Sequence, residues 1–136
     1  MNKKECIELV RKEKVGYLAT SDKDSQPYVR PVDMKTVYGD DIYFSTFITA
    51  DKIKQIEQCN KVEAIFVQNY TQLRIIGTAE LIKDESTRQK FLADNKGIAD
   101  MLENGDSSSL LIYRIIPKTV RYMGGDDNTY TLVSWM

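Results

Sequence analysis

The chain has 136 residues, 42% hydrophobic and 29% charged, a composition typical of one globular domain, which we expect to span residues 1–136. Its 19 basic and 20 acidic residues give a net charge of −1, so no overall field would recruit nucleic acid or a membrane surface. Histidine is absent, which excludes serine–histidine and cysteine–histidine nucleophiles and histidine-containing zinc sites.

The first half of the chain predicts a helix, three strands and a second helix. In chain order these cover residues 2–13, 15–20, 27–38, 42–47 and 49–59. Cys6, Leu9 and Val10 form the apolar stripe of the first helix, and the segment "YGDD" predicts a tight hairpin turn between the last two strands. Thr49 is the expected N-cap of the second helix.

The second half predicts four more strands and one long helix. The strands cover residues 62–68, 72–83, 109–123 and 129–135, with a turn at 124–128 before the last. The helix covers 84–105, is entered through Ser86 and is expected to break near Gly97. Pro117 predicts a bulge or an edge position within its strand.

Most consecutive strands are joined by short turns, which favours antiparallel pairing. The helices do not alternate regularly with strands, so a doubly wound parallel sheet is not expected. The pattern predicts a mainly β (α+β) fold, a closed or half-closed antiparallel barrel with peripheral helices. No repeat or linker divides the chain.

Arg30 occupies an unusual place in its predicted strand. Strand alternation puts Tyr28, Arg30, Val32 and Met34 on one face, so a guanidinium stands in an apolar row. Either Arg30 lies at the rim with its aliphatic stem packed and its head in water, or an anion lies against that face. The residues alone leave both interpretations open.

Lys52 lies in the first turn of its predicted helix, where the helix dipole disfavours a cation. Its position is explained if a phosphate lies between the ammonium and the first-turn N–H groups. The alternative is a solvated lysine paired with Asp51 or Glu57. The segment "TFITADK" is not a glycine-rich phosphate loop, so a P-loop is excluded by residue type.

Other kinds of site find little support. Cys6 and Cys59 lack the spacing of a disulfide framework or a zinc site, and a reducing cytoplasm suits them best. No apolar run approaches the ~20 residues of a membrane span, and the charged N-terminal segment is not typical of a signal peptide. The "GGDDN" segment lacks the spacing of a calcium loop, and no RNP-type aromatic pattern indicates RNA binding.

Four segments, taken in order, resemble the FMN-binding split-barrel family typified by pyridoxamine 5′-phosphate oxidase. They are "VGYLAT", "PYVRPVDMK", "IYFSTFITADKIKQI" and "QLRIIGTAEL", and they span residues 15–83. Within the family the chain looks most like the short, general-stress-protein-like bacterial members. The resemblance implies an antiparallel split β-barrel and an obligate homodimer with FMN at the subunit interface.

The resemblance also implies a set of cofactor-binding residues. Arg30 and Lys52 match the phosphate-binding cations, and the stretch after Arg30 matches the segment that runs along the isoalloxazine ring. Ser45 and Thr46 match a hydroxyl pair beside the ring or ribityl chain, and Gln72 matches a polar residue that reaches the cofactor from the partner subunit. The full set is Arg30, Pro31, Val32, Asp33, Lys35, Ser45, Thr46, Lys52 and Gln72.

The chain departs from the family pattern in two ways. Asp51 stands where the oxidase has a second arginine, and the oxidase's C-terminal arginine–histidine motif is absent. We therefore expect an FMN-dependent oxidoreductase that acts on a small molecule but is not a true pyridoxamine phosphate oxidase. The alternatives are a non-catalytic flavin-binding, storage or sensor protein, and a member that binds the deazaflavin F420 or no flavin.

Overall fold

The computed structural model describes residues 1–102, 107–125 and 128–135. The helices in these ranges are α1 (Lys3–Glu13), α2 (Asp51–Gln58), α3 (Glu85–Asp94) and α4 (Lys96–Asp100). The strands are β1 (Val15–Ser21), β2 (Pro27–Asp33), β3 (Thr36–Tyr38), β4 (Asp41–Phe47), β5 (Lys61–Gln68), β6 (Thr71–Leu81), β7 (Leu110–Met123) and β8 (Thr131–Leu132). None of the described helices is both long and apolar enough to cross a membrane.

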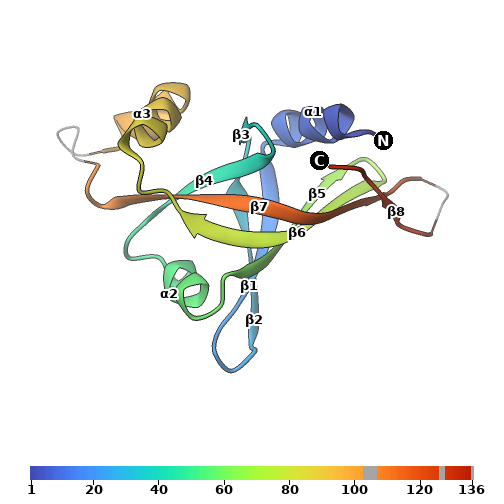
Figure 1. Ribbon diagram of the computed structural model, residues 1–136, viewed down its shortest axis with the longest axis horizontal. Coiled ribbons are helices and arrows are strands. Elements are labelled where there is room, and N and C mark those ends of the chain that lie inside the picture. The colour runs from blue at the N-terminus through green and yellow to red at the C-terminus, as the bar shows by residue number, and fades with distance from the viewer. Residues whose placement is uncertain (103–106, 126–127, 136) are drawn as a thin grey trace.

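The strands form one antiparallel sheet in the order β2-β1-β5-β6-β7-β4-β3, with β8 added on β7 (Figure 1). β2 and β3 lie at opposite ends of this order, yet only Met34 and Lys35 separate them in the chain. The sheet therefore curls until its ends meet at that junction. The predicted antiparallel split barrel with peripheral helices is confirmed.

The strand predicted over 27–38 is wrong in one respect, because two strands replace it. Met34 N donates to Lys14 O (2.7 Å), and the Asp33 carboxylate accepts from Lys35 N (3.1 Å). The amides of Met34 and Lys35 therefore do not take part in regular hydrogen bonding between strands. The chain leaves β1 as its partner and takes up β4 instead.

The barrel core is built by alternation along the strands. Leu18, Val32, Phe44, Phe66 and Ile75 all point inward and are buried. The N-terminal helix α1 covers this core with its buried stripe, which is the stripe that the sequence predicts. The inward face of β2 also carries Arg30, which is half-buried, next to buried Val32.

The helix after β6 has its N-cap two residues before the predicted Ser86 and breaks close to Gly97, as predicted. Asp84, not Ser86, is the N-cap of α3, since its carboxylate accepts from Thr87 N (3.1 Å). The break between α3 and α4 lies at buried Asn95, two residues before Gly97, where the side-chain amide of Asn95 donates to Phe91 O (2.8 Å). The end of the predicted helix, 103–105, lies outside the described residues.

Pro117 marks a bulge, as predicted. The β6–β7 register shifts between Ile76 and Gly77, which face Thr119 and Pro117. The final predicted strand, 129–135, shrinks to Thr131–Leu132, and the indole of Trp135 donates to Asp40 O (2.8 Å). The predicted 124–128 turn falls partly on residues outside the described ranges.

Candidate functional site

The opening of the barrel lies between β2 and β4. Within the described chain β2 pairs only with β1, and the segment Ser45–Phe47 of β4 pairs only with β7. The β4 strand then leads into α2, which packs against β1 at this end of the barrel (Figure 1). Unpaired strand edges present N–H and C=O groups that a ligand can bind.

Arg30 is held in place by neutral groups. Its Nη1 donates to Leu18 O (3.2 Å) and to Thr20 Oγ1 (2.7 Å), and its Nη2 donates to Gln55 Oε1 (2.5 Å). No carboxylate forms an ion pair with Arg30 among the described residues. The guanidinium is therefore hydrogen-bonded to the protein through three of its donors, while Arg30 as a whole is only half-buried, so the rim and the anion-site interpretations both stay open.

Lys52 is a second, partly buried cation close to the first. Burial lowers the pKa of the Lys52 ammonium, and the positive charge of Arg30 lowers it further. Burial also lowers the pKa of Arg30, and the carboxylate of Asp51 partly opposes that shift. Two neighbouring cations without a direct ion pair favour the binding of an anion between or beside them.

The first turn of α2 adds donors to the same place. The predicted N-cap, Thr49, is wrong, because Ala50 takes that position, and within the described part of the chain no side-chain hydrogen bond caps the helix. An uncapped N-terminus favours negative charge through its N–H groups and the helix dipole. Asp51 supplies one negative charge in this turn and so competes with an external anion.

A cavity of about 340 Å³ adjoins Lys52. Its lining residues are Ser45, Thr46, Phe47, Thr49, Ala50, Lys52, Ile98, Met101 and Leu110. Hydroxyl groups of β4 therefore share a cavity with the cation, and α4 supplies apolar side chains to its wall. Small-molecule sites commonly combine an apolar wall with a few polar groups in this way.

The other predicted site residues are distributed differently. Val32 is buried in the core, whereas Pro31 and Asp33 point to the outer face of β2. Lys35 forms an ion pair with Asp33 (2.9 Å). Gln72 is the second residue of β6 and accepts from the Tyr130 hydroxyl (2.9 Å). Within one chain Lys52, Ser45 and Thr46 line one cavity, and Arg30 lies near Lys52 without being part of that lining. Gln72 does not line this cavity either.

Sequence reasoning missed two residues that touch Arg30. Gln55 is buried on α2, one turn after Lys52, and Thr20 is buried on β1. The Thr20 hydroxyl donates to Gln55 Oε1 (2.6 Å), so the two side chains are bonded to each other as well as to Arg30. The available signal was only the helical spacing, which puts Gln55 one turn after Lys52 on the same side of the predicted helix.

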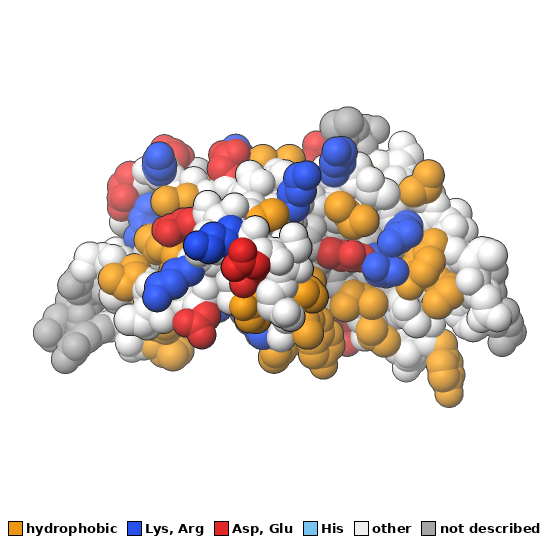
Figure 2. Space-filling model, turned by 90° about the horizontal axis from the view of Figure 1, so that it is seen from below, with side chains coloured by type: hydrophobic (Ala, Val, Ile, Leu, Met, Phe, Trp, Pro, Cys, Tyr) orange, Lys and Arg blue, Asp and Glu red, His pale blue; other side chains and the backbone are white. Residues whose placement is uncertain are grey.

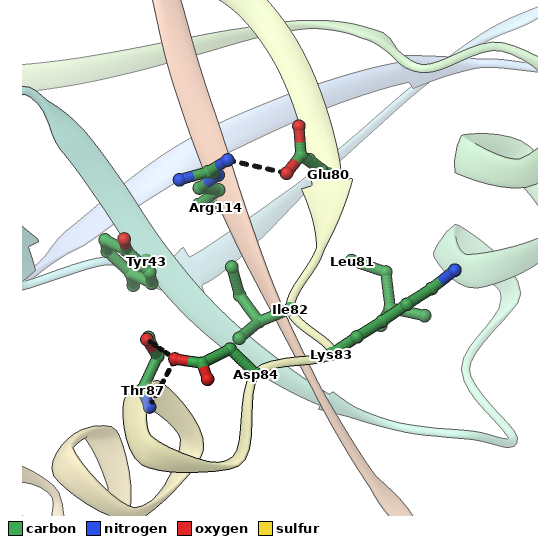
Figure 3. Close-up of a pocket in the computed structure, with 8 residues that line it drawn as sticks. All are labelled: Tyr43, Glu80, Leu81, Ile82, Lys83, Asp84, Thr87 and Arg114. Carbon is green, nitrogen blue, oxygen red and sulfur yellow. Dashed lines mark hydrogen bonds and ion pairs between the residues drawn. The ribbon is translucent and has the colours of Figure 1, made fainter.

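A second and larger cavity, of about 550 Å³, lies where β6 runs into α3 (Figure 3). Arg114 reaches into it and bonds to Glu80 (2.6 Å), and Asp41 lies 3.5 Å from its other side. The Glu80 carboxylate raises the pKa of Arg114. Because two carboxylates balance the charge of Arg114, this cavity is a weaker candidate for binding an anion than the barrel opening is.

The end of the molecule that carries α2 has no continuous basic stripe. Figure 2 shows Lys and Arg side chains there interspersed with Asp and Glu side chains and with hydrophobic groups. A duplex-binding protein would gather its basic side chains on one face. The positive charge at the barrel opening is thus local, as the sequence predicts for an anion site.

Comparison with known proteins gives a family and a fold. A family model described as pyridoxamine 5′-phosphate oxidase matches residues 3–124. No curated protein matches the chain in sequence.

Three solved structures illustrate the likeness of fold. A NimC/NimA family protein from Clostridium acetobutylicum has a TM-score of 0.79 at 20% identity, over 96% of this chain and 92% of that one. General Stress Protein 26 from Bacillus anthracis has a TM-score of 0.77 at 18% identity, over 96% and 97%. A pyridoxamine 5′-phosphate oxidase-related, FMN binding protein from Nostoc punctiforme has a TM-score of 0.69 at 14% identity, over 96% and 87%.

Proposed function

We propose that this chain, which belongs to the pyridoxamine 5′-phosphate oxidase family, is a flavoprotein that binds FMN at the barrel opening. One observation carries the proposal: the charge of Arg30 lies close enough to Lys52 to lower the pKa of its ammonium, and neither cation forms an ion pair among the described residues. The name of the Nostoc punctiforme neighbour, an FMN binding protein, supports the same cofactor.

The residues at the opening suit a phosphate monoester. Such a group carries between one and two negative charges near neutral pH, which the two cations would balance. Each charge-assisted hydrogen bond contributes about 1.5–3 kcal/mol. Ser45 and Thr46 would then meet the polar part of the ligand, and the apolar wall from α4 would cover part of it.

We further propose that the chain forms a homodimer through the outer face of β2, β1 and β5. Val29, Val15, Tyr17 and Val67 are 68%, 46%, 49% and 45% exposed on that face. Tyr17 lies in register between Pro31 on β2 and Ile65 on β5, so the apolar side chains form a continuous row. Exposed apolar rows of this kind mark protein interfaces. In such a dimer Gln72 of one subunit would reach the cofactor of the other.

The activity we propose is an FMN-dependent oxidoreductase that acts on a small molecule. When bound, the flavin ring would supply the redox chemistry. The protein would hold the phosphate with Arg30 and Lys52 and shield the ligand from water. Since the sequence has no histidine, we do not propose pyridoxamine phosphate as the substrate.

The test begins with the purified, untagged protein. We expect visible flavin absorption and an acid-released chromophore with the mass of FMN, near one per chain. Arg30→Ala and Lys52→Ala should each weaken FMN binding tenfold or more, which is about 1.4 kcal/mol. Lys54→Ala is the matched control, since Lys54 is exposed on the same helix.

Other results of these experiments would refute the cofactor, the site or the activity separately. A protein that takes up F420 and not FMN, or neither compound, would refute the proposed cofactor. Normal FMN affinity in both variants would refute the site. Holoprotein that turns over with neither NADH nor NADPH would favour a storage or sensor protein over an oxidoreductase.

A further inference from the structure

Gln55, Thr20 and Arg30 form a closed hydrogen-bonded triangle. Gln55 Oε1 accepts from Arg30 Nη2 (2.5 Å) and from the Thr20 hydroxyl (2.6 Å), and Thr20 Oγ1 in turn accepts from Arg30 Nη1 (2.7 Å). Gln55 and Thr20 are 8% and 3% exposed, so water does not readily replace either partner. The triangle joins α2, β1 and β2, the elements that surround the barrel opening.

The hydrogen bonds leave part of the guanidinium free. An arginine has five N–H donors, and Leu18 O, Thr20 Oγ1 and Gln55 Oε1 account for three of them. The Nε–H and one Nη2–H have no acceptor among the described residues. Two free N–H groups on one guanidinium suit a bidentate contact with a phosphate.

All three acceptors of Arg30 are uncharged. A carboxylate at position 55 would satisfy the same donors equally well, and it would also cancel the positive charge. The chain has glutamine there, so the guanidinium is oriented while its charge is left uncompensated. Lys52 lies one turn earlier on the same helix, so its charge adds to that of Arg30.

We propose that Gln55 is a positioning residue, supported by Thr20, which aims Arg30 at the phosphate and, by being neutral, makes the site selective for the phosphorylated flavin. This inference rests on the proposed FMN binding. It predicts that position 55 governs the preference for FMN over riboflavin, which shares the ring and ribityl chain but has no phosphate. A residue that only anchored α2 to β1 would affect both ligands alike.

The experiment compares FMN and riboflavin affinities, measured by quenching of flavin fluorescence on the full-length protein. Gln55→Glu should weaken FMN binding at least tenfold and riboflavin binding less than threefold. Gln55→Met, which removes the acceptor without adding charge, should weaken FMN binding about three- to tenfold. Gln58→Glu makes the same charge change on the exposed part of α2 and should leave both affinities within twofold.

A double variant tests whether Gln55 acts through Arg30. In an Arg30→Ala background, Gln55→Met should produce no further loss of FMN affinity, because the group that it orients is gone. Equal losses for FMN and riboflavin, or full additivity of the two substitutions, would overturn the inference. So would wild-type FMN affinity in Gln55→Glu.

A wild-type protein that binds no FMN would refute the proposed function instead. The inference is then decided separately with inorganic phosphate, monitored by the NMR signals of the Arg30 and Lys52 side chains. Shifts in the wild type that disappear in Gln55→Glu would support it. Absence of shifts in the wild type, or equal shifts in both proteins, would overturn it.

Discussion

Asp51→Asn should tighten FMN binding while it weakens the fold, and these opposite signs make it an informative substitution. Asp51 is the first residue of α2 and provides the acidic charge of the first turn. Its carboxylate also acts on Arg30. Removing the charge takes away a favourable interaction with the helix dipole and, equally, a repulsion against a bound phosphate.

The size of each effect follows from the position of Asp51. For two unit charges taken to be about 7 Å apart, Coulomb's law gives an interaction of about 0.6 kcal/mol in water and about 2.4 kcal/mol at an effective dielectric constant of 20. Asp51 is exposed, so the lower value applies. It corresponds to roughly threefold tighter binding. The loss at the helix terminus should cost about 0.3–1 kcal/mol of stability.

The assay pairs fluorescence titration with FMN and urea unfolding of the apoprotein. Glu85→Gln is the matched control, because Glu85 is the first residue and the first-turn acid of α3. That control should lower stability by a similar amount and leave FMN affinity unchanged. Unchanged or weaker FMN binding in Asp51→Asn would refute the placement of the phosphate at α2.

Three further expectations concern the bulge, the second cation and the outer face. Gly77→Ala should lower the free energy of unfolding by about 1–3 kcal/mol, measured by urea unfolding, because an added Cβ would lie 2.2 Å from Ile116 O. Gly124→Ala is the control and should cost little, since its nearest neighbour lies at 3.8 Å. Equal losses of stability in the two variants would refute this expectation. FMN affinity should fall as the pH rises through the lowered pKa of Lys52, because phosphate binds the charged ammonium. In the Lys52→Met variant the Kd for FMN, measured over the same pH range, should no longer show this fall in affinity. Val29→Lys should convert the proposed dimer to a monomer, as measured by light scattering, with an unchanged circular dichroism spectrum. A dimer that persists in this variant would contradict the proposed interface.

Sequence patterning predicted the strands well because most of them have one buried face. The alternation along 27–33 correctly placed Arg30 beside Val32 on the inner face. The same pattern failed at Met34 and Lys35, where hydrogen bonds from outside the strand end its ladder. Periodicity reports which face is buried but carries no information on which partner each amide finds.

The candidate site was predictable only in part. Arg30 and Lys52 could be singled out because each is a cation in an unfavourable place. The family resemblance then assigned both of them to one phosphate site. Gln55 and Thr20 could not, because a single uncharged polar residue in a helix or strand gives no sign of what it bonds to. Thr49 was mistaken for the cap because residue type alone does not fix where a helix begins.

The pairing of β4 with β7 determines when, during translation, the cavity at the barrel opening can form. Arg30, Lys52, Gln55 and Thr20 have all been translated once the chain reaches residue 58, and their strands and helix are near one another in sequence. The cavity, however, includes Leu110, and Thr46 lies opposite Leu111 in the β4–β7 ladder. Contacts across such separations form late. A nascent chain therefore carries the side chains of the proposed anion site through most of translation, but the cavity beside them closes only after β7 has docked.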